Sequence, residues 1–378
     1  MPPHAPALRG AGKPAVPLSA LVFPSIDPTP IFEQFRGNYA HELLTAAVAH
    51  FGLFDLLARG PMPVDQVRHE LRLAERPSVV LFTALRAMGL LALDAAGCLE
   101  LTPLAREHLT PGSTFDVSDY LGLAAESPGV LEMATRLRLN RPSDAPRAAL
   151  NAAAGEPDPA AGTAFIFRAG TESAMEHETS ARRLTLALAG RAKNVAPLLA
   201  ARMPLGDAHV LLDVGGGTGI YSIACLQQNP GLRAIVWDRP EVLKVTAEFA
   251  AAYGVADRLE CQPGDMFRDP VPEGVDVILM SNILHDWDVP ECRTLLARCA
   301  AALPPTGQLL IHDVFLNDAH DGPLPVALYS AALFLLTEGR AYSAAEYCAW
   351  LTAAGLTPSS LIPTIIHCAI LPAHPSRS

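Results

Sequence analysis

The sequence predicts an α/β protein, in which a doubly wound parallel sheet follows a mainly helical N-terminal region. From about residue 207 onward, apolar runs of strand length alternate with helical patterns, which is typical of a parallel sheet covered by helices on both faces. A glycine-rich turn directly follows the first of these runs, whereas the preceding half lacks the alternation. A length of 378 residues predicts two domains, and 50% apolar residues are enough for two cores.

The N-terminal region has the order of elements of a winged helix. Three helical patterns are followed by two short strand patterns around a tight turn, and Gly60-Pro61 separates the first two helical patterns. These elements are expected at 28–58, 64–71, 77–88, 90–93 and 98–101. We therefore expect a winged-helix domain over residues 25–112. Such a domain either binds DNA or forms a dimer.

Charge favours the dimer over DNA. The formal net charge is −11, and the expected helix at 64–71 carries only Arg68 as a basic residue apart from histidine, so a basic recognition surface is lacking. We expect a homodimer through this domain and no nucleic-acid partner. No run of 18 apolar residues exists, so we expect no membrane span.

Cysteine usage points to a reducing compartment. The chain has seven cysteines with no C-x-x-C pair and no framework spacing, and several stand in apolar contexts. We expect reduced thiols in a cytoplasmic protein and no metal site.

Two further segments complete the predicted organisation. Residues 1–24 are rich in Pro and Ala, so we expect a disordered leader. Residues 113–190 read as a helical linker that lines the active site, interrupted by a Pro/Ala/Gly-rich loop at 141–162. The second domain is then expected over 191–378.

The second domain shows five strand patterns with helical patterns between them. The strands are expected at 209–213, 233–237, 258–262, 275–280 and 307–313. The helices are expected at 219–229, 240–253 and 290–303, and two last strands near 356–362 and 365–371. Ligands of such sheets bind at the carboxyl ends of the strands, so candidate site residues are sought there.

The turn after the first strand is typical of a nucleotide-type cofactor site. Asp213 ends the apolar run, and Gly215, Gly217 and Gly219 follow. Glycines let the backbone approach a ligand closely and adopt positive φ. The dinucleotide fingerprint G-x-G-x-x-G would need a third glycine at position 220, where the chain has Ile220.

The spacing D-x-G-x-G-x-G instead resembles motif I of the class I S-adenosylmethionine (SAM) methyltransferases. This resemblance implies SAM as cofactor and S-adenosylhomocysteine as product, with Asp213 accepting hydrogen bonds from the amino-acid tail. A nicotinamide cofactor and a purely structural turn are the alternatives.

Two more strand ends carry acids at suitable places for this cofactor. Asp238 lies 19 residues after Gly219 and can accept from both ribose hydroxyls, or it can cap the helix that starts at Pro240. Asp265 can accept from the adenine amine while Met266 packs on the ring, unless this segment is a plain turn.

The sequence Leu284-His285-Asp286-Trp287-Asp288 follows the fourth strand and makes the resemblance specific. It is similar to the catalytic segment of the two-domain small-molecule O-methyltransferases, the plant caffeate-type enzymes and their bacterial relatives that act on hydroxyneurosporene and polyketides. The resemblance covers about residues 28 to 371. It implies a dimerising winged helix, an antiparallel hairpin that closes the sheet, and methyl transfer to a hydroxyl oxygen of a small secondary metabolite.

By this resemblance His285 is the general base and Asp313, at the end of the fifth strand, orients it. A phenol with a pKa near 10 is mostly protonated at neutral pH, and a neutral imidazole with a pKa near 6.5 can take its proton. His312 should face the opposite side of the sheet, because side chains alternate along a strand. The resemblance further assigns Ser281 to the cofactor and four residues to the acceptor: Met175, Glu178, Asp286 and Trp287.

Two departures from the family pattern are visible. A basic residue often stands where this chain has Ser281, and a second acid often stands where it has Ala341, with Glu338 three residues earlier. The missing acid leaves the acceptor atom open, so C-, N- or S-methylation by proximity is an alternative to O-methylation. A SAM-binding regulator that uses its winged helix on DNA is the alternative from another class.

Overall fold

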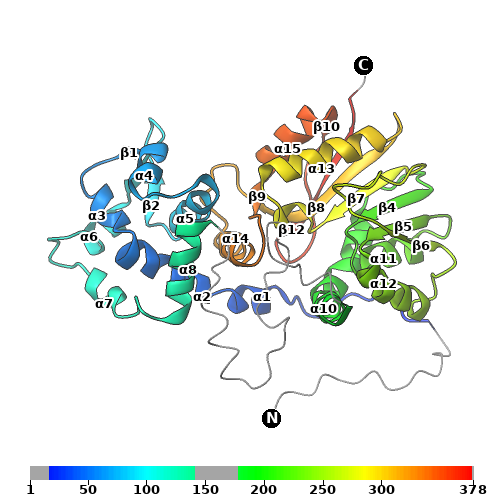
Figure 1. Cartoon of the computed structure of the whole chain (residues 1–378), viewed down its shortest axis with the longest axis horizontal. Helices are drawn as coiled ribbons and strands as arrows, with labels where there is room; N and C mark the ends of the chain where they lie inside the picture. Colours follow the sequence, from blue (N-terminus) through cyan, green and yellow to red (C-terminus); the bar gives the residue numbers. More distant parts are fainter. Residues whose placement is uncertain (1–16, 141–177, 377–378) are drawn as a thin grey trace, which may run out of the picture.

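The computed structural model describes residues 17–140 and 178–376. Figure 1 shows a helical N-terminal half and a sheet-containing C-terminal half, with helix α14 (Leu324–Leu336) between them. The leader residues 1–16, the expected loop at 141–162 and residues 163–177 of the expected helical linker lie outside the described residues.

The N-terminal half contains short helices and a small antiparallel sheet. The helix expected over 28–58 is divided, because Gly52 adopts a left-handed conformation with φ 57° and the chain turns at Gly37. The helices are α1 (Thr29–Phe35), α2 (Asn38–Thr45), the π-helix η1 (Ala46–His50), α3 (Leu53–Leu57), α4 (Val64–Glu70), α5 (Glu75–Ala87), α6 (Pro103–His108), α7 (Ser118–Gly122) and α8 (Pro128–Leu139). The strands β1 (Met62–Pro63), β2 (Leu91–Leu93) and β3 (Cys98–Leu101) pair in the order β1-β3-β2.

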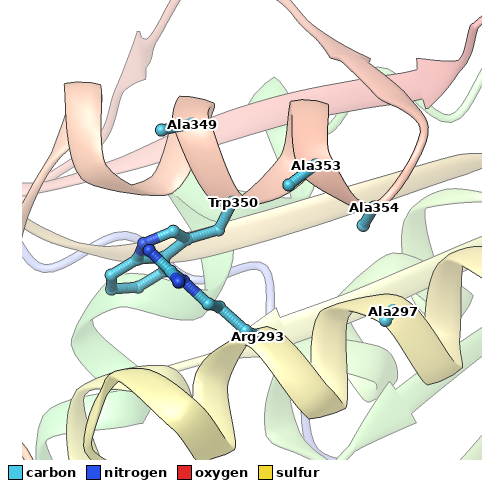
Figure 2. A pocket seen from close by; sticks show the side chains of 6 residues that line it. All are labelled: Arg293, Ala297, Ala349, Trp350, Ala353 and Ala354. Carbon is cyan, nitrogen blue, oxygen red and sulfur yellow. The ribbon is translucent and has the colours of Figure 1, made fainter.

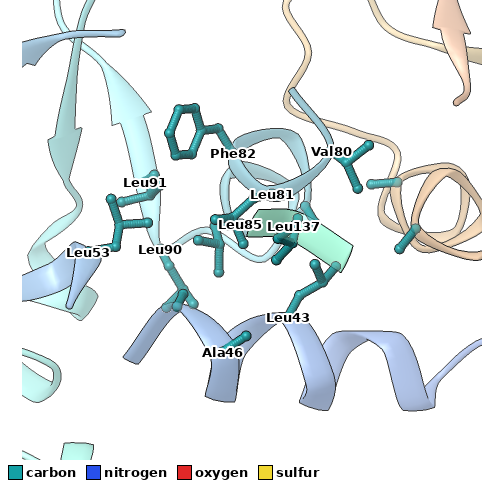
Figure 3. Close-up of a cluster of buried hydrophobic side chains, with 14 of the residues drawn as sticks. Leu43, Ala46, Leu53, Val80, Leu81, Phe82, Leu85, Leu90, Leu91 and Leu137 are labelled. Carbon is teal, nitrogen blue, oxygen red and sulfur yellow. The ribbon is translucent and has the colours of Figure 1, made fainter. Parts of the chain in front are cut away.

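The core of this half includes residues from the C-terminal half. Figure 3 shows apolar side chains of α2, α5 and α8, among them Leu43, Leu81 and Leu137, directed toward one another. Phe334 of α14 belongs to the same buried cluster. Burial of a large apolar side chain stabilises a fold by about 1.5–3 kcal/mol, so α14 fixes the two halves to each other.

The C-terminal half contains the predicted sheet. Its strands follow the order β10-β12-β8-β7-β4-β5-β6, with β9 paired to β8 and β11 to β12. The strands β4 to β8 pair in parallel, and β12 is antiparallel to both β8 and β10, which confirms the expected closing strands. Their bounds are β4 (Val210–Val214), β5 (Arg233–Asp238), β6 (Leu259–Pro263), β7 (Val277–Ser281), β8 (Gln308–Leu316), β9 (Tyr342–Ser343), β10 (Leu356–Pro358), β11 (Ile362–Pro363) and β12 (Cys368–Pro375).

Helices cover both faces of this sheet, as predicted. One buried cluster joins α10, α11 and α12 to Leu211 and Leu279, and another joins α13 and α15 to Leu212 and Ile278, so neighbouring residues of one strand face opposite layers. The bounds are α10 (Glu178–Arg202), α11 (Ile220–Gln228), α12 (Pro240–Ala252), the 3-10 helix η3 (Leu284–Asp286), α13 (Val289–Ala302) and α15 (Ala344–Ala353). Helix α10 continues through the domain boundary expected at residue 190.

The strand order reverses between β4 and β7, because β5 and β6 extend the sheet to one side and β7 and β8 to the other. Ligands of open parallel sheets bind at such a reversal, beyond the carboxyl ends of the strands. The fold therefore predicts a ligand site formed by the segments at the carboxyl ends of β4, β5, β6, β7 and β8.

The last residues of the expected leader are attached to this half. The backbone N–H of Leu18 donates to Ala252 O at 3.0 Å, and Ala20 N donates to Gln227 Oε1 at 2.7 Å. Ala20 is buried. Among the described residues, no helix combines the length and the apolar character that a membrane crossing requires.

Candidate active site

The turn after β4 presents a buried carboxylate that is only half satisfied. Asp213 Oδ2 accepts a hydrogen bond from Ser222 Oγ at 2.7 Å, while Oδ1 is buried and has no partner. Burial raises the pKa of Asp213 to about 7, although the Ser222 hydroxyl works in the opposite direction. An unpaired buried acceptor is costly, so this atom is suited to a donor supplied by a ligand.

The glycines of the turn leave space on one side. Gly217 has φ 59°, and a Cβ placed there would meet no atom within 4 Å, whereas a Cβ at Gly215 would lie 2.5 Å from Ile283 Cδ1. Gly217 N–H donates to Asp238 Oδ2 at 2.9 Å, and Arg239 N–H donates to Oδ1 at 2.7 Å. The structure thus brings the β4 turn and the acid after β5 together, as the sequence predicts.

The segment after β6 lies against the predicted catalytic segment. Asp265 Oδ1 accepts from Phe267 N–H at 2.8 Å, and the Phe267 ring meets the Trp287 indole edge-on with centroids 4.7 Å apart. Met266 is half-buried in the cluster that contains Trp287, and its carbonyl accepts from Arg298 Nε at 3.1 Å. Asp213, Asp238 and Asp265 therefore stand at three neighbouring strand ends, which fits the polar groups of SAM.

His285 and Asp313 form a buried pair. His285 lies on η3 after β7, and its Nδ1 is 2.6 Å from Asp313 Oδ1. The prediction that Asp313 ends its strand is wrong, because β8 continues to Leu316. A carboxylate can only accept, so Nδ1 carries the proton and Nε2 keeps its lone pair. Asp313 Oδ1 also accepts from Val314 N–H at 2.8 Å, and Oδ2 accepts from Tyr347 OH at 3.3 Å. The carboxylate is therefore held in place from three directions.

A second acid stands near the other nitrogen of the imidazole. Asp286 Oδ1 is 3.7 Å from His285 Nε2, which is too far for a hydrogen bond but close enough for a strong charge interaction. Burial opposes the charged imidazole, but the carboxylates of Asp313 and Asp286 outweigh it and raise the pKa of His285. Burial raises the pKa of Asp286 to about 6, against the opposing effect of His285. The two carboxylates thus stabilise the doubly protonated imidazolium that forms when Nε2 takes a second proton.

Ser281 and His312 belong to the opposite face of the sheet, as alternation along β8 predicts for His312. Ser281 Oγ is 2.8 Å from His312 Nδ1, and His312 Nε2 is 3.1 Å from Thr364 Oγ1. Burial lowers the pKa of His312 to about 3, with a further contribution from Arg191, so this histidine is neutral. The Ser281 hydroxyl, predicted to contact the cofactor, is thereby engaged with a protein partner.

The predicted acceptor residues have different surroundings. Trp287 is buried, and its carbonyl accepts from Tyr342 OH at 2.6 Å. Glu178 is exposed on α10 and pairs with Lys244 of α12 at 2.6 Å, and no described contact joins it to His285. Met175 lies outside the described residues.

The position of the missing family acid is part of the core. Ala341 is fully buried, and its N–H donates to Ser330 Oγ at 3.1 Å. Glu338 N–H donates to Asp286 O at 3.1 Å, so the backbone of Glu338 adjoins the catalytic segment. Asp286, which is nearer to the imidazole than the sequence alone indicates, is the second acid beside His285.

Three residues at the site were not predicted. Tyr347 lies 34 positions after Asp313 and gives no sequence signal for its contact. Tyr329 of α14 meets the His285 ring with centroids 5.6 Å apart, and Arg191 of α10 donates to Asn282 Oδ1 at 3.0 Å. Arg191 gave no hint in the sequence, because it is one of several basic residues on α10.

A shallow pocket elsewhere carries no such chemistry. Figure 2 shows it between α13 and α15, where Trp350 and Arg293 lie beside small side chains. Its remaining lining residues are Ala297, Ala349, Ala353 and Ala354. Within 17–140 and 178–376, no group of three His, Cys, Asp or Glu side chains could hold a metal ion.

Comparison with known proteins identifies the family. The O-methyltransferase domain family matches residues 159–357. The chain belongs to this O-methyltransferase family. It is 34% identical over 332 residues to a 3-hydroxy-5-methyl-1-naphthoate 3-O-methyltransferase of Streptomyces sahachiroi, covering 87% of this chain and 89% of the relative.

A solved structure and a relative of different specificity extend this finding. An O-methyltransferase family 2 protein of Planctomyces limnophilus, solved with apigenin, has a TM-score of 0.83 and 46% identity, covering 95% of this chain and 99% of that one. An L-tyrosine C(3)-methyltransferase of Streptomyces lavendulae is 29% identical, covering 86% of this chain and 85% of that relative. This methyltransferase family uses SAM, and the chain is a SAM-dependent methyltransferase of the O-methyltransferase type.

Proposed function

We propose that the protein methylates a hydroxyl group on a hydroxylated aromatic secondary metabolite, with His285 as general base. The observation that carries this proposal is the buried pair of His285 Nδ1 and Asp313 Oδ1 at 2.6 Å, which leaves Nε2 available to take a proton. The similar Streptomyces enzyme acts on a hydroxynaphthoate, and the similar Planctomyces structure contains apigenin. Both molecules carry phenolic hydroxyls.

We assign the cofactor to the residues at the ends of β4, β5 and β6. Asp213 offers its unpartnered Oδ1 to the amino-acid tail, Asp238 faces the ribose, and Asp265 with Met266 faces the adenine. When bound, SAM supplies an electrophilic methyl group on a sulfonium.

The protein's part is to place the acceptor hydroxyl and to remove its proton. Asp313 fixes the imidazole so that Nε2 faces the acceptor, and its charge stabilises the imidazolium that forms when the proton arrives. Positioning contributes as much as proton transfer, because an oriented reactant pair avoids the entropic cost of encounter. Asp286 adds a second negative charge beside Nε2 and faces the same acceptor.

The experiment mixes the protein with SAM and either 3-hydroxy-1-naphthoate or its 3-methoxy derivative, and detects products by mass spectrometry. We expect one added methyl group on the free phenol and none on the blocked phenol. Methylation of both compounds would favour a ring carbon as acceptor, the reaction named for the tyrosine C(3)-methyltransferase relative. Apigenin is supplied in a third reaction, and absence of methylation of all three compounds would contradict the proposed acceptor class.

We also propose that the protein is a homodimer through a winged-helix N-terminal domain. Four large apolar side chains near the start of the described chain are exposed by 69% to 81%: Val22, Ile26, Ile31 and Phe35. Exposed apolar side chains gathered in one segment are typical of an interface. Sedimentation at several concentrations tests this, and a monomer throughout would contradict it. The seven free cysteines support a cytoplasmic location.

A further inference from the structure

Two arginines from distant parts of the chain meet at one aromatic ring beside His285. The guanidinium carbon of Arg36, just after α1, lies 3.7 Å from the centroid of the Tyr329 ring. The guanidinium carbon of Arg191 on α10 lies 5.9 Å from the same centroid. Tyr329 in turn meets the His285 ring edge-on at 5.6 Å. Both guanidinium groups therefore lie beside the aromatic ring that contacts the candidate base.

Neither arginine has a carboxylate counter-ion among the described residues. Arg191 donates to Asn282 Oδ1 and to Cys368 Sγ, each at 3.0 Å, and its Nε is buried without a partner. Asn282 and the Cys368 thiol are both neutral, since burial raises the pKa of this thiol. The Arg36 side chain contacts the Tyr329 ring and forms no ion pair with a described residue.

The two charges also disfavour each other. Burial, and after it the charge of Arg191, lowers the pKa of Arg36. Burial opposes the charge of Arg191, but Cys368, Tyr329 and Asp313 outweigh it and raise the pKa of Arg191, although none of them forms an ion pair with it. Partly buried like charges without a carboxylate in contact are costly, because bulk water compensates them only in part. The arrangement therefore becomes favourable when an anion enters.

The position of Arg36 is fixed by a separate contact. Glu33, three residues earlier in α1, accepts from His367 Nε2 at 2.6 Å, and His367 directly precedes β12. This contact attaches α1 to the sheet half and uses the Glu33 carboxylate, which leaves Arg36 to face Tyr329. Figure 1 shows α1 between the helical half and α10.

We propose that Arg36 and Arg191 bind a carboxylate beside His285. A guanidinium presents a planar set of donors that matches a carboxylate, and its stacking on Tyr329 holds that plane in position. The proposal rests on the proposed function, because the carboxylate belongs to one of the two reactants. It is either a substituent of the aromatic acceptor or the carboxylate of the cofactor's methionine part, and two measurements distinguish these sources.

The acceptor measurement compares 3-hydroxy-1-naphthoate with its methyl ester, using kcat/KM of the wild type and of Arg36→Gln. If the acceptor supplies the carboxylate, kcat/KM of Arg36→Gln falls about 10- to 100-fold for the acid and changes little for the ester. Arg36→Lys keeps the charge and recovers part of the loss. Arg233→Gln, an exposed position on β5, is the matched control.

The cofactor measurement titrates S-adenosylhomocysteine and 5′-methylthioadenosine, which lacks the carboxylate, into Arg191→Gln and Arg191→Lys. If the cofactor supplies the carboxylate, Arg191→Gln binds S-adenosylhomocysteine about 10- to 100-fold more weakly than the wild type does. It binds 5′-methylthioadenosine with wild-type affinity. The lysine variant keeps part of the affinity, which separates lost charge from lost folding.

The proposal is overturned if Arg36→Gln and Arg191→Gln both behave as the wild type does in these two measurements. It is also overturned if Arg36→Gln affects acid and ester equally and Arg191→Gln weakens S-adenosylhomocysteine and 5′-methylthioadenosine equally. The proposed function fails separately, if the wild type methylates neither the acid nor the ester. In that case the titrations with S-adenosylhomocysteine still test the arginine pair.

Discussion

Asp313 Oδ1 lies 2.6 Å from His285 Nδ1, and both side chains are almost completely buried. This contact joins the segment that follows β7 to β8, the parallel neighbour of β7 in the sheet. It fixes which imidazole nitrogen carries the proton and which one can accept another. In the proposed function, the pair therefore defines the direction from which an acceptor hydroxyl approaches.

Replacement of the acid should disturb this tautomer. We predict that Asp313→Asn lowers kcat about 100-fold or more, because a side-chain amide can donate to Nδ1 and thereby stabilise the wrong tautomer. Tyr347→Phe removes only the 3.3 Å contact to Oδ2 and should cost less than about tenfold. Steady-state kinetics test both variants. An Asp313→Asn variant as active as Tyr347→Phe would contradict the orienting role.

The acid limb of the pH profile should depend on Asp286. His285 must be neutral to accept a proton, so kcat/KM rises with pH through the pKa of His285, which Asp286 helps to raise. We predict that Asp286→Asn moves this limb to lower pH and changes the high-pH plateau by less than about tenfold. Asp119→Asn, exposed on α7, should leave the profile unchanged. An acid limb at the wild-type pH in Asp286→Asn would show that Asp286 does not influence the pKa of His285.

Gly339 should be required by the catalytic segment. A Cβ at this position would lie 2.1 Å from His285 O and 2.6 Å from Trp287 N, both backbone atoms that cannot move aside easily. We predict that Gly339→Ala lowers the free energy of unfolding by about 1–3 kcal/mol and reduces activity. Gly231→Ala, where a Cβ meets nothing within 4 Å, is the matched control. Denaturant unfolding gives the comparison, and equal stability of the two variants would contradict the packing described.

Cofactor affinity should depend on the charge of Asp213. Because burial raises the pKa of Asp213 to about 7, the carboxylate is largely protonated below this pH and charged above it. We predict that S-adenosylhomocysteine binds more tightly as the pH rises through about 7, and that Asp213→Asn binds about 10- to 100-fold more weakly. Calorimetry at several pH values measures this, with exposed Asp257→Asn as control. A variant with wild-type affinity would remove Asp213 from the cofactor site.

Local patterns predicted the parts of this site that lie at strand ends. Asp238 is the last residue of the apolar strand β5 and Asp213 the next-to-last residue of β4, so both could be placed before the fold was known. Asp313 was also placed on its strand, although β8 continues three residues beyond it. The contact between His285 and Asp313 followed because parallel strands end at one edge of the sheet. The helix expected over 28–58 was divided, since its apolar pattern does not reveal the left-handed Gly52.

Contacts between distant elements could not be predicted in this way. Arg191 and Tyr329 lie on α10 and α14, and Arg36 directly follows α1. The packing of these three helices is decided by tertiary structure, and no spacing in the sequence relates them. Arg191 donates to Asn282, which adjoins Ser281, and this contact between α10 and the segment after β7 also left no pattern in the sequence. The role of Asp286 emerged only from its 3.7 Å separation from Nε2.

The central claim, that His285 takes the acceptor proton, is tested most directly by kcat of His285→Ala with 3-hydroxy-1-naphthoate, measured beside its affinity for S-adenosylhomocysteine. We predict a loss of about 10²–10⁴-fold in kcat with unchanged affinity, while His209→Ala, an exposed position before β4, keeps both values. Near-wild-type turnover by His285→Ala would contradict the account and leave transfer to positioning alone.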